Sequence, residues 1–107
     1  MNDILTKQLY THVIQDENSV QIVLANESHP IFKAHFEGNP LLPAFLQVDI
    51  AAEILGLSIK RIGKSKFMEP LLPSDHLLLS HEERLGKTYI KWIKNGKTAS
   101  EITLEIE

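Results

Sequence analysis

The sequence contains no cysteine, so it can form neither a disulfide bond nor a thiolate nucleophile. No apolar run approaches the roughly 20 residues that a membrane-spanning helix needs, so we expect no membrane segment. The formal net charge of -3 argues against general binding to nucleic acid. A phosphate-binding glycine loop is also missing.

The 107 residues, of which 43% are hydrophobic and 23% are charged, have the composition of an ordinary globular protein. We expect one domain over residues 1–107, without a repeat or a linker. A domain of this size leaves much of its surface exposed, so a stabilising partner subunit is expected. The N-terminal residues lack the basic segment and apolar stretch of a signal peptide, which together with the missing cysteines predicts a cytoplasmic protein.

The N-terminal part of the chain is typical of a β-hairpin followed by a loop. Strands are predicted at residues 10–15 and 19–25, because apolar and polar residues alternate in the second of them. Residues 26–42 contain two prolines and a glycine and are predicted to form a loop. A helix is predicted next, over Ala44–Leu55.

Four strand-like segments follow the helix, at residues 58–67, 77–83, 88–94 and 98–106. The last two are joined by Asn95-Gly96, a strong signal for a two-residue hairpin turn. Two strands, one apolar helix and four further strands predict an α+β domain in which an antiparallel sheet wraps around a single helix.

Asp49 is an acidic residue inside the predicted helix, which Pro43 would begin and Gly56 would end. Its apolar neighbours on the helix surface, within about 60° of it, are Leu42, Phe45, Leu46 and Ala52. We therefore expect the carboxyl group to be desolvated and to keep its proton. Glu53, one turn later, is expected to reach solvent.

His35 lies in the preceding loop, fourteen residues before Asp49. An imidazole takes or gives a proton near neutral pH, and a carboxyl group in apolar surroundings can donate one. Two such groups beside one pocket are suited to an elimination. The other histidines are expected to be structural, and without cysteine or a helical i, i+4 pair they predict no zinc site. They are His12, His29, His76 and His81.

Four basic residues fall within seven positions just after the helix, although the whole chain is acidic. They are Lys60, Arg61, Lys64 and Lys66. One interpretation is a solvated strand face, and the other is a docking surface for an acidic partner.

Two motifs resemble a known family. From His35 the chain reads His-Phe-Glu-Gly-Asn-Pro-Leu-Leu-Pro-Ala and reaches Asp49 in the helix. This resembles the His-Phe-Pro-Gly-x-Pro-x-Met-Pro-Gly motif, with a helical Glu or Asp, of the hot-dog-fold β-hydroxyacyl-acyl carrier protein dehydratases. The second motif, from Phe67 to Asp75, resembles the Phe-x-x-Pro-x-x-Pro-Gly-Asp turn of that family. The resemblance extends from about Ser19 to the C-terminus.

The resemblance implies a hot-dog dimer that dehydrates a 3-hydroxyacyl thioester to the 2-enoyl thioester without a metal or redox cofactor. His35 would be the base, and Asp49 would be the acid and would reach the histidine of the other subunit. The backbone N–H of Ala44 would polarise the thioester carbonyl. An acyl carrier protein would deliver the acyl chain on its phosphopantetheine arm and dock on the four basic residues. The implied substrate-binding positions are Phe32, Phe36, Gly38, Pro43, Leu46 and Ile50.

Three positions depart from the family pattern. Glu37 replaces a proline and places a negative charge two residues from His35, which would raise the pKa of that imidazole. More of the imidazole would then carry a proton at neutral pH, where it would be weakened as a base. Ala44 replaces a glycine but keeps its N–H, and Ser74 replaces a turn glycine. Two rival functions therefore stay open. One is a hot-dog thioesterase, whose helix carboxylate would activate water, and the other is a non-catalytic acyl-binding subunit, which Glu37 and Ala44 favour.

Overall fold

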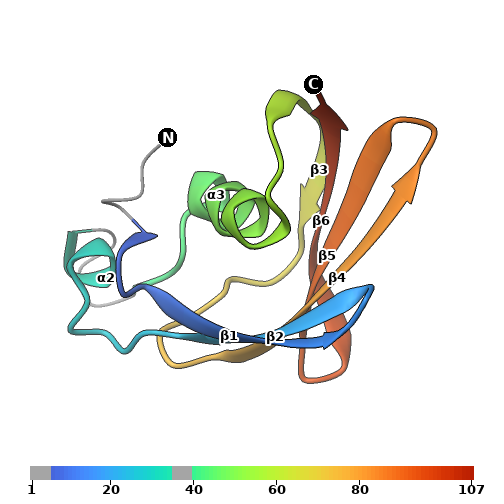
Figure 1. Cartoon of the computed structure of the whole chain (residues 1–107). Helices are drawn as coiled ribbons and strands as arrows, with labels where there is room; N and C mark the ends of the chain where they lie inside the picture. The colour runs from blue at the N-terminus through green and yellow to red at the C-terminus, as the bar shows by residue number, and fades with distance from the viewer. Residues whose placement is uncertain (1–5, 35–39) are drawn as a thin grey trace.

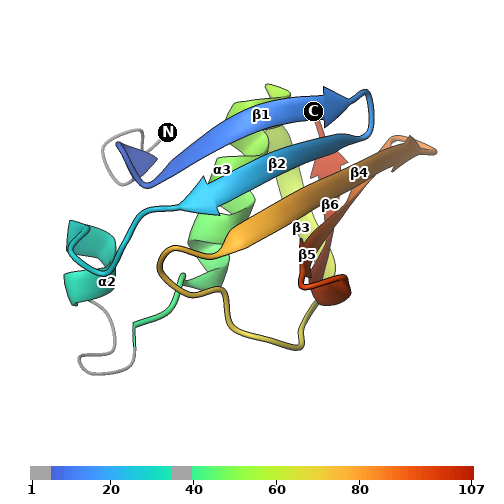
Figure 2. The same cartoon turned by 90° about the horizontal axis from the view of Figure 1, so that it is seen from below.

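The computed structural model describes residues 6–34 and 40–107. In chain order the elements are β1 (Tyr10–Asp16), β2 (Ser19–Leu24), α2 (Pro30–Ala34), α3 (Ala44–Leu55), β3 (Ile59–Phe67), β4 (His76–Arg84), β5 (Lys87–Lys94) and β6 (Lys97–Ile106). The strands form an antiparallel sheet in the order β1-β2-β4-β5-β6-β3, which curves around α3 (Figure 1). Figure 2 shows β1 and β2 crossing in front of α3. The predicted sheet around one central helix is confirmed.

The core lies between α3 and the face of the sheet that is turned toward it. Side chains alternate between the two faces of a strand, and on β2 the buried set is Val20, Ile22 and Leu24. From the helix, Leu46 and Ile50 are fully buried. Burying a side chain of this kind stabilises a protein by about 1.5–3 kcal/mol, so these contacts hold α3 on the sheet.

A buried hydrogen bond fixes the rotation of α3 about its own axis. Gln47 is 3% exposed, and its Oε1 accepts a hydrogen bond of 2.7 Å from the hydroxyl of Ser100 on β6. Residues two positions apart on a helix point in nearly opposite directions. Because Gln47 points into the sheet, Asp49 is turned away from the centre of the sheet.

The helix α3 has the predicted bounds because both of its ends carry strong local signals. Pro43 precedes the helix with a φ of -59°, which suits a helix start. Gly56 ends the helix at a φ of 67°, a left-handed conformation that glycine adopts without a Cβ clash. The N–H of Gly56 donates to the carbonyl of Ala52 and so satisfies one of the last helical carbonyls.

The predicted strands are confirmed to within one residue at each end. The predicted hairpin turn is confirmed as well, because Asn95 and Gly96 have φ values of 53° and 76°, as a type I′ turn requires. The predicted loop at residues 26–42 is wrong in part, because it contains the five-residue helix α2. A helix of five residues is too short to show an apolar period in the sequence.

The strands β1 and β3 are the two edges of the sheet. At the β3 edge Ile62, Phe67 and the following Met68 are 51%, 49% and 48% exposed. An edge strand presents unpaired backbone groups, and natural proteins usually protect such edges with charge or cover them. The β1 edge also carries exposed apolar side chains, since Val13 and Ile14 are 64% and 70% exposed. Exposed apolar side chains along an edge are typical of a surface that contacts another chain.

Candidate active site

Asp49 lines a pocket of 430 Å³ beside α3. The pocket lies between the C-terminal half of α3, the segment that leads into β3, and the C-terminal end of the chain. Its lining residues are Asp49, Ala52, Glu53, Leu57, Ser58, Ile59 and Glu107. Alanine, leucine and isoleucine side chains give the pocket apolar walls, so the half-buried carboxyl group of Asp49 meets both hydrocarbon and polar groups.

The surroundings of Asp49 raise the pKa of its carboxyl group above the ordinary value of 3.8. Burial is the largest cause, because desolvation disfavours the charged form, and the negative charge of Glu53 is the second. This is the direction that the apolar helix pattern predicted. A carboxyl group with a raised pKa keeps its proton closer to neutral pH, which is a property of a general acid.

The prediction that Glu53 reaches solvent is wrong. Its side chain is half-buried, and its Oε1 accepts a hydrogen bond of 2.9 Å from the hydroxyl of Tyr10. Its Oε2 accepts a second hydrogen bond, from the hydroxyl of Thr6. The two donors are 43 and 47 residues away in the sequence, so the local helix pattern gives no signal for them.

Several predicted site residues lie outside the residues that the structure describes. They are His35, Phe36 and Gly38, and Glu37 lies with them. The structure therefore describes the predicted acid and its pocket, whereas the predicted base remains a prediction.

Ala44 is the first residue of α3, and it is exposed. No side chain caps this end of the helix within the described residues, so the positive end of the helix dipole is left for a developing negative charge. Asp49 follows five residues later, which is about 7.5 Å along the axis at 1.5 Å per residue. Along the helix axis, the predicted acid and the predicted oxyanion donor are thus far enough apart to contact different groups of one substrate.

Most of the predicted substrate-binding residues that the structure describes lie in the core. Phe32, Leu46 and Ile50 are 2%, 0% and 0% exposed and pack within the hydrophobic core, and Pro43 is half-buried just before α3. Phe45, which is 50% exposed, is the apolar side chain in the first turn of α3 that a substrate can reach. Sequence reasoning did not select Phe45 as a binding residue, although its place beside Ala44 was a signal.

The second motif forms a turn that is fixed by the carboxylate of Asp75. Its Oδ2 accepts a hydrogen bond of 2.7 Å from the N–H of Leu72 and lies 2.8 Å from Nζ of Lys94 on β5. The same ammonium group donates to the carbonyl of Pro70 at 3.1 Å. One aspartate and one lysine therefore tie both ends of the turn to the sheet.

This turn also holds the segment that leads into α3. The N–H of Leu42 donates to the carbonyl of Leu71 at 2.8 Å. Ser74 has a φ of 66°, the left-handed conformation of the glycine that it replaces in the family pattern. The turn thereby fixes the start of α3 and the position of Ala44.

His29 has a structural role, as predicted. Its Nδ1 accepts a hydrogen bond of 3.1 Å from the N–H of Ile31 at the start of α2. The other ring nitrogen, Nε2, lies 2.8 Å from the carbonyl of Lys7 and must carry the proton that it donates there. Among the described residues, no group of three or more histidine and carboxylate side chains is arranged to hold a metal ion.

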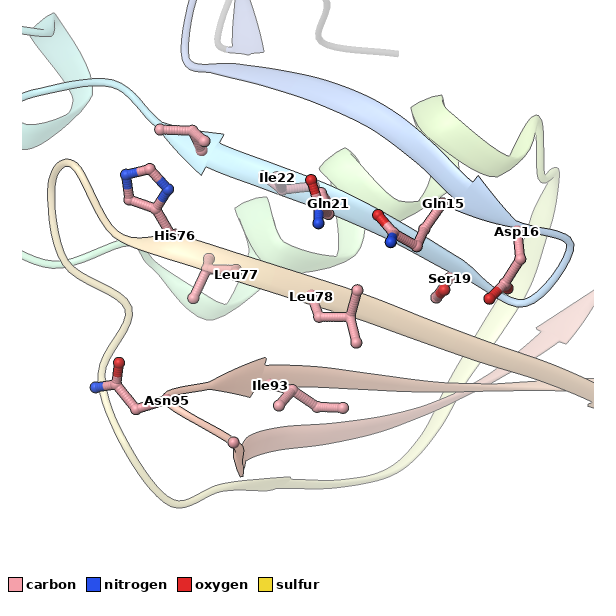
Figure 3. A pocket seen from close by; sticks show the side chains of 12 residues that line it. Gln15, Asp16, Ser19, Gln21, Ile22, His76, Leu77, Leu78, Ile93 and Asn95 are labelled. Atoms are coloured by element: carbon pink, nitrogen blue, oxygen red, sulfur yellow. The ribbon is translucent and has the colours of Figure 1, made fainter.

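A larger hollow of 640 Å³ lies over β2, β4 and β5 (Figure 3). His76 and Asp16 lie at opposite ends of it, as Figure 3 shows. The N–H of Asn18, followed by the hydroxyl of Ser19, lowers the pKa of Asp16. The hollow therefore does not bring its histidine and its carboxylate together, and the pocket at Asp49 is the candidate acid-base site.

The four basic residues all lie on the edge strand β3 and are exposed. Arg61 donates from Nε to the carboxylate of Glu105 on β6 at 3.1 Å, and this hydrogen bond lowers the pKa of Glu105. Lys66 lies opposite Glu101 in the register of β3 with β6. Acidic residues on the neighbouring strand thus offset part of the positive charge of β3.

Within the described ranges, no helix combines the length and the apolar character needed to cross a membrane.

A chain of the dehydratase heterocomplex ApeI:P from Xenorhabdus doucetiae superposes on this chain with a TM-score of 0.71 and 26% sequence identity. The match covers 94% of this chain and 97% of that chain.

Two relatives carry FabZ in their names. The 3-hydroxyacyl-[acyl-carrier-protein] dehydratase FabZ of Klebsiella pneumoniae is 29% identical over 80% of this chain and 69% of its own length. The bifunctional enzyme LpxC/FabZ of Chlorobaculum tepidum is 32% identical over 60% of this chain, and the match spans 17% of that enzyme. The family model of the ApeI-like proteins, described as ApeI dehydratase, matches residues 12–102. Because that match takes in most of the chain and the solved relative shares the sheet around one helix, we conclude that this protein has the hot-dog fold and belongs to the ApeI-like dehydratase family.

Proposed function

We propose that this protein removes water from a 3-hydroxyacyl thioester and forms the 2-enoyl thioester. The observation that carries the proposal is the carboxyl group of Asp49, which is half-buried in a pocket of 430 Å³ and has a raised pKa. The ApeI-like family and the FabZ relatives support the same class of reaction.

In the proposed reaction, His35 takes the proton from the carbon next to the thioester carbonyl. The electrons of that C–H bond form the new carbon–carbon double bond, and the C–O bond to the hydroxyl group breaks. Asp49 donates its proton to the departing hydroxyl, which leaves as water. The N–H of Ala44 at the start of α3 stabilises the negative charge that develops on the thioester oxygen.

We further propose that two subunits share each site, so that Asp49 acts together with His35 of the partner subunit. The exposed apolar side chains along β3 support a partner at this edge. A second copy of this chain is the partner that we propose. The relative from Xenorhabdus doucetiae is part of a heterocomplex, so a different hot-dog chain is the alternative.

The proposed substrate is carried on the phosphopantetheine arm of an acyl carrier protein in the cytoplasm. Acyl carrier proteins are acidic, and the exposed lysines of β3 offer charge of the opposite sign beside the proposed subunit interface. The name of the FabZ relative, a 3-hydroxyacyl-[acyl-carrier-protein] dehydratase, supports this carrier.

The test is to remove each member of the dyad. His35→Ala and Asp49→Asn should each lower the rate of dehydration by a factor of about 10² to 10⁴, because one positioned acid or base typically contributes that much. The double variant should lose little more dehydration activity than the less active of the two single variants, since the two groups act in one step. His76→Ala, at an exposed histidine away from the Asp49 pocket, is the matched control and should keep wild-type activity.

The assay should follow enoyl thioester absorbance and thiol release together, on 3-hydroxyacyl thioesters of several chain lengths. Formation of the enoyl thioester by the wild type, and its loss in both single variants, is the expected result. Thiol release without the enoyl product would identify a thioesterase instead. Binding of the acyl thioester with neither product would identify a non-catalytic acyl-binding subunit.

A further inference from the structure

A second carboxylate lies one helical turn after Asp49 and lines the same pocket. Residues four apart on a helix lie on the same face, so Glu53 and Asp49 are neighbours on α3. Glu53 receives one hydrogen bond on each carboxylate oxygen, from the hydroxyls of Tyr10 and Thr6. Both donors lie outside α3, so these hydrogen bonds are tertiary contacts and are not part of the helix itself.

The two hydroxyl donors hold the charge of Glu53 in one place. An exposed glutamate samples many rotamers, and its charge is screened by water and salt. A carboxylate that is half-buried and held by two donors keeps its position and acts on its neighbour through less water. The neighbour on its helix face is Asp49.

The charges around Asp49 favour its protonated form. After desolvation, the charge of Glu53 is the largest cause that raises the pKa of Asp49. Glu107, at the C-terminal end of the chain, lines the pocket as a further acidic side chain. The amino-terminal charge acts in the opposite direction and is the smallest of the causes. No lysine or arginine is among the residues that line this pocket within the described part of the chain.

We propose that Glu53, held by Tyr10 and Thr6, is a positioning residue that keeps Asp49 in its proton-donating form. The inference rests on the proposed dehydration, in which Asp49 must deliver a proton to the leaving hydroxyl. Glu53 touches neither the substrate nor the reacting atoms in this role. It acts through Asp49, and its own contacts with the N-terminal segment hold it in place.

The test compares two variants that separate charge from anchoring. Glu53→Gln removes the charge but keeps an oxygen that can accept a hydrogen bond. Tyr10→Phe removes one donor and leaves the charge of Glu53 in place. Glu53→Met is a second uncharged variant, to be used if the glutamine variant does not fold. Thermal unfolding of each variant reports how much the anchoring contributes to stability.

The decisive measurement is the titration of the Asp49 carboxyl carbon by ¹³C nuclear magnetic resonance, with the signal assigned by its loss in Asp49→Asn. The midpoint should move to lower pH in Glu53→Gln, and by a smaller amount in Tyr10→Phe, where the charge stays but loses one of its two hydrogen-bond donors. In activity assays, Glu53→Gln should lose a larger share of its dehydration rate at pH 8 than at pH 6.

An unchanged Asp49 midpoint in a folded, uncharged variant would overturn the inference, whether or not the protein dehydrates a thioester. So would an activity loss by the same factor at every pH, because that pattern belongs to a residue with a structural role alone. The titration needs no turnover. A shifted midpoint in a wild-type protein that dehydrates nothing would therefore count against the proposed function and not against the effect of Glu53 on Asp49.

Discussion

The side chain of Asp49 is half-buried and ionisable, and the pKa of its carboxyl group is raised. This raised pKa affects both its ability to donate a proton and the pH dependence of the stability of the fold. Folding makes this carboxyl group harder to ionise than its ordinary pKa of 3.8 implies. Between that value and the higher folded-state pKa, the folded chain holds a proton that the unfolded chain has lost. The group thus contributes its stability at low pH, and the contribution is lost as the pH rises through the folded-state pKa.

Asp49→Asn should accordingly raise the melting temperature at pH 7 to 8, where the wild type must hold an ionised carboxylate against desolvation. The gain should stay below about 1 kcal/mol, because the side chain is only half-buried. It should shrink as the pH falls toward 4, where the protonated acid and the amide are both neutral. Circular dichroism melts at pH 4, 6 and 8 provide the measurement. A gain of equal size at all three pH values would show that charge is not its cause.

Ser74 is a second residue whose backbone conformation carries a cost. Its φ of 66° is left-handed, and a side chain with a Cβ atom pays roughly 1–2 kcal/mol there. Ser74→Gly should raise the free energy of unfolding by about 0.5–1 kcal/mol. This gain is smaller than the backbone cost, because glycine also gives the unfolded chain extra conformational freedom. Urea denaturation measures the change. Ser28→Gly, at an exposed serine without a positive φ, is the control and should lose stability.

At the scale of elements, the sequence predicted what depends on neighbouring residues. The bounds of α3 follow from Pro43 and Gly56, and the strands follow from their alternating pattern. The environment of Glu53 could not be predicted in the same way, because its partners are 43 and 47 residues distant. Likewise the burial of Gln47 depends on Ser100, which is 53 residues away and becomes its neighbour only when the sheet closes around the helix.

The turn that ends in Asp75 is an element whose contribution can be measured. Asp75→Ala should lower the free energy of unfolding by about 1–3 kcal/mol, because it leaves the N–H of Leu72 and the ammonium of Lys94 without their acceptor. Urea denaturation again provides the measurement. Asp16→Ala is the matched control, since Asp16 also accepts a turn N–H but is exposed. Equal losses in the two variants would argue against a special role for the Asp75 turn.

At the scale of the whole molecule, the chain is acidic overall but carries a basic edge strand. Lys60→Glu with Lys64→Glu should slow turnover of a carrier-linked substrate more than turnover of a small thioester analogue, because the field of these charges acts on the acidic carrier. Added salt should reduce the difference. Lys97→Glu, at an exposed lysine on β6, is the control. Equal slowing of turnover for both substrates would show that the basic residues of β3 form a solvated strand face and not a docking surface.

The two edges of the sheet allow a paired test of subunit assembly. A domain of 107 residues with exposed apolar side chains along β3 is expected to pair through that edge, so light scattering at micromolar concentration should give about twice the chain mass of 12.1 kDa. Ile62→Lys places a charge on the β3 edge, where the side chain is 51% exposed, and should produce monomers that lose activity. Val13→Lys is the matched control on the β1 edge, where the side chain is 64% exposed, and should remain a dimer. A folded wild-type monomer with full dehydratase activity would contradict both the dimer and the shared site, because a lone chain would then hold acid and base together.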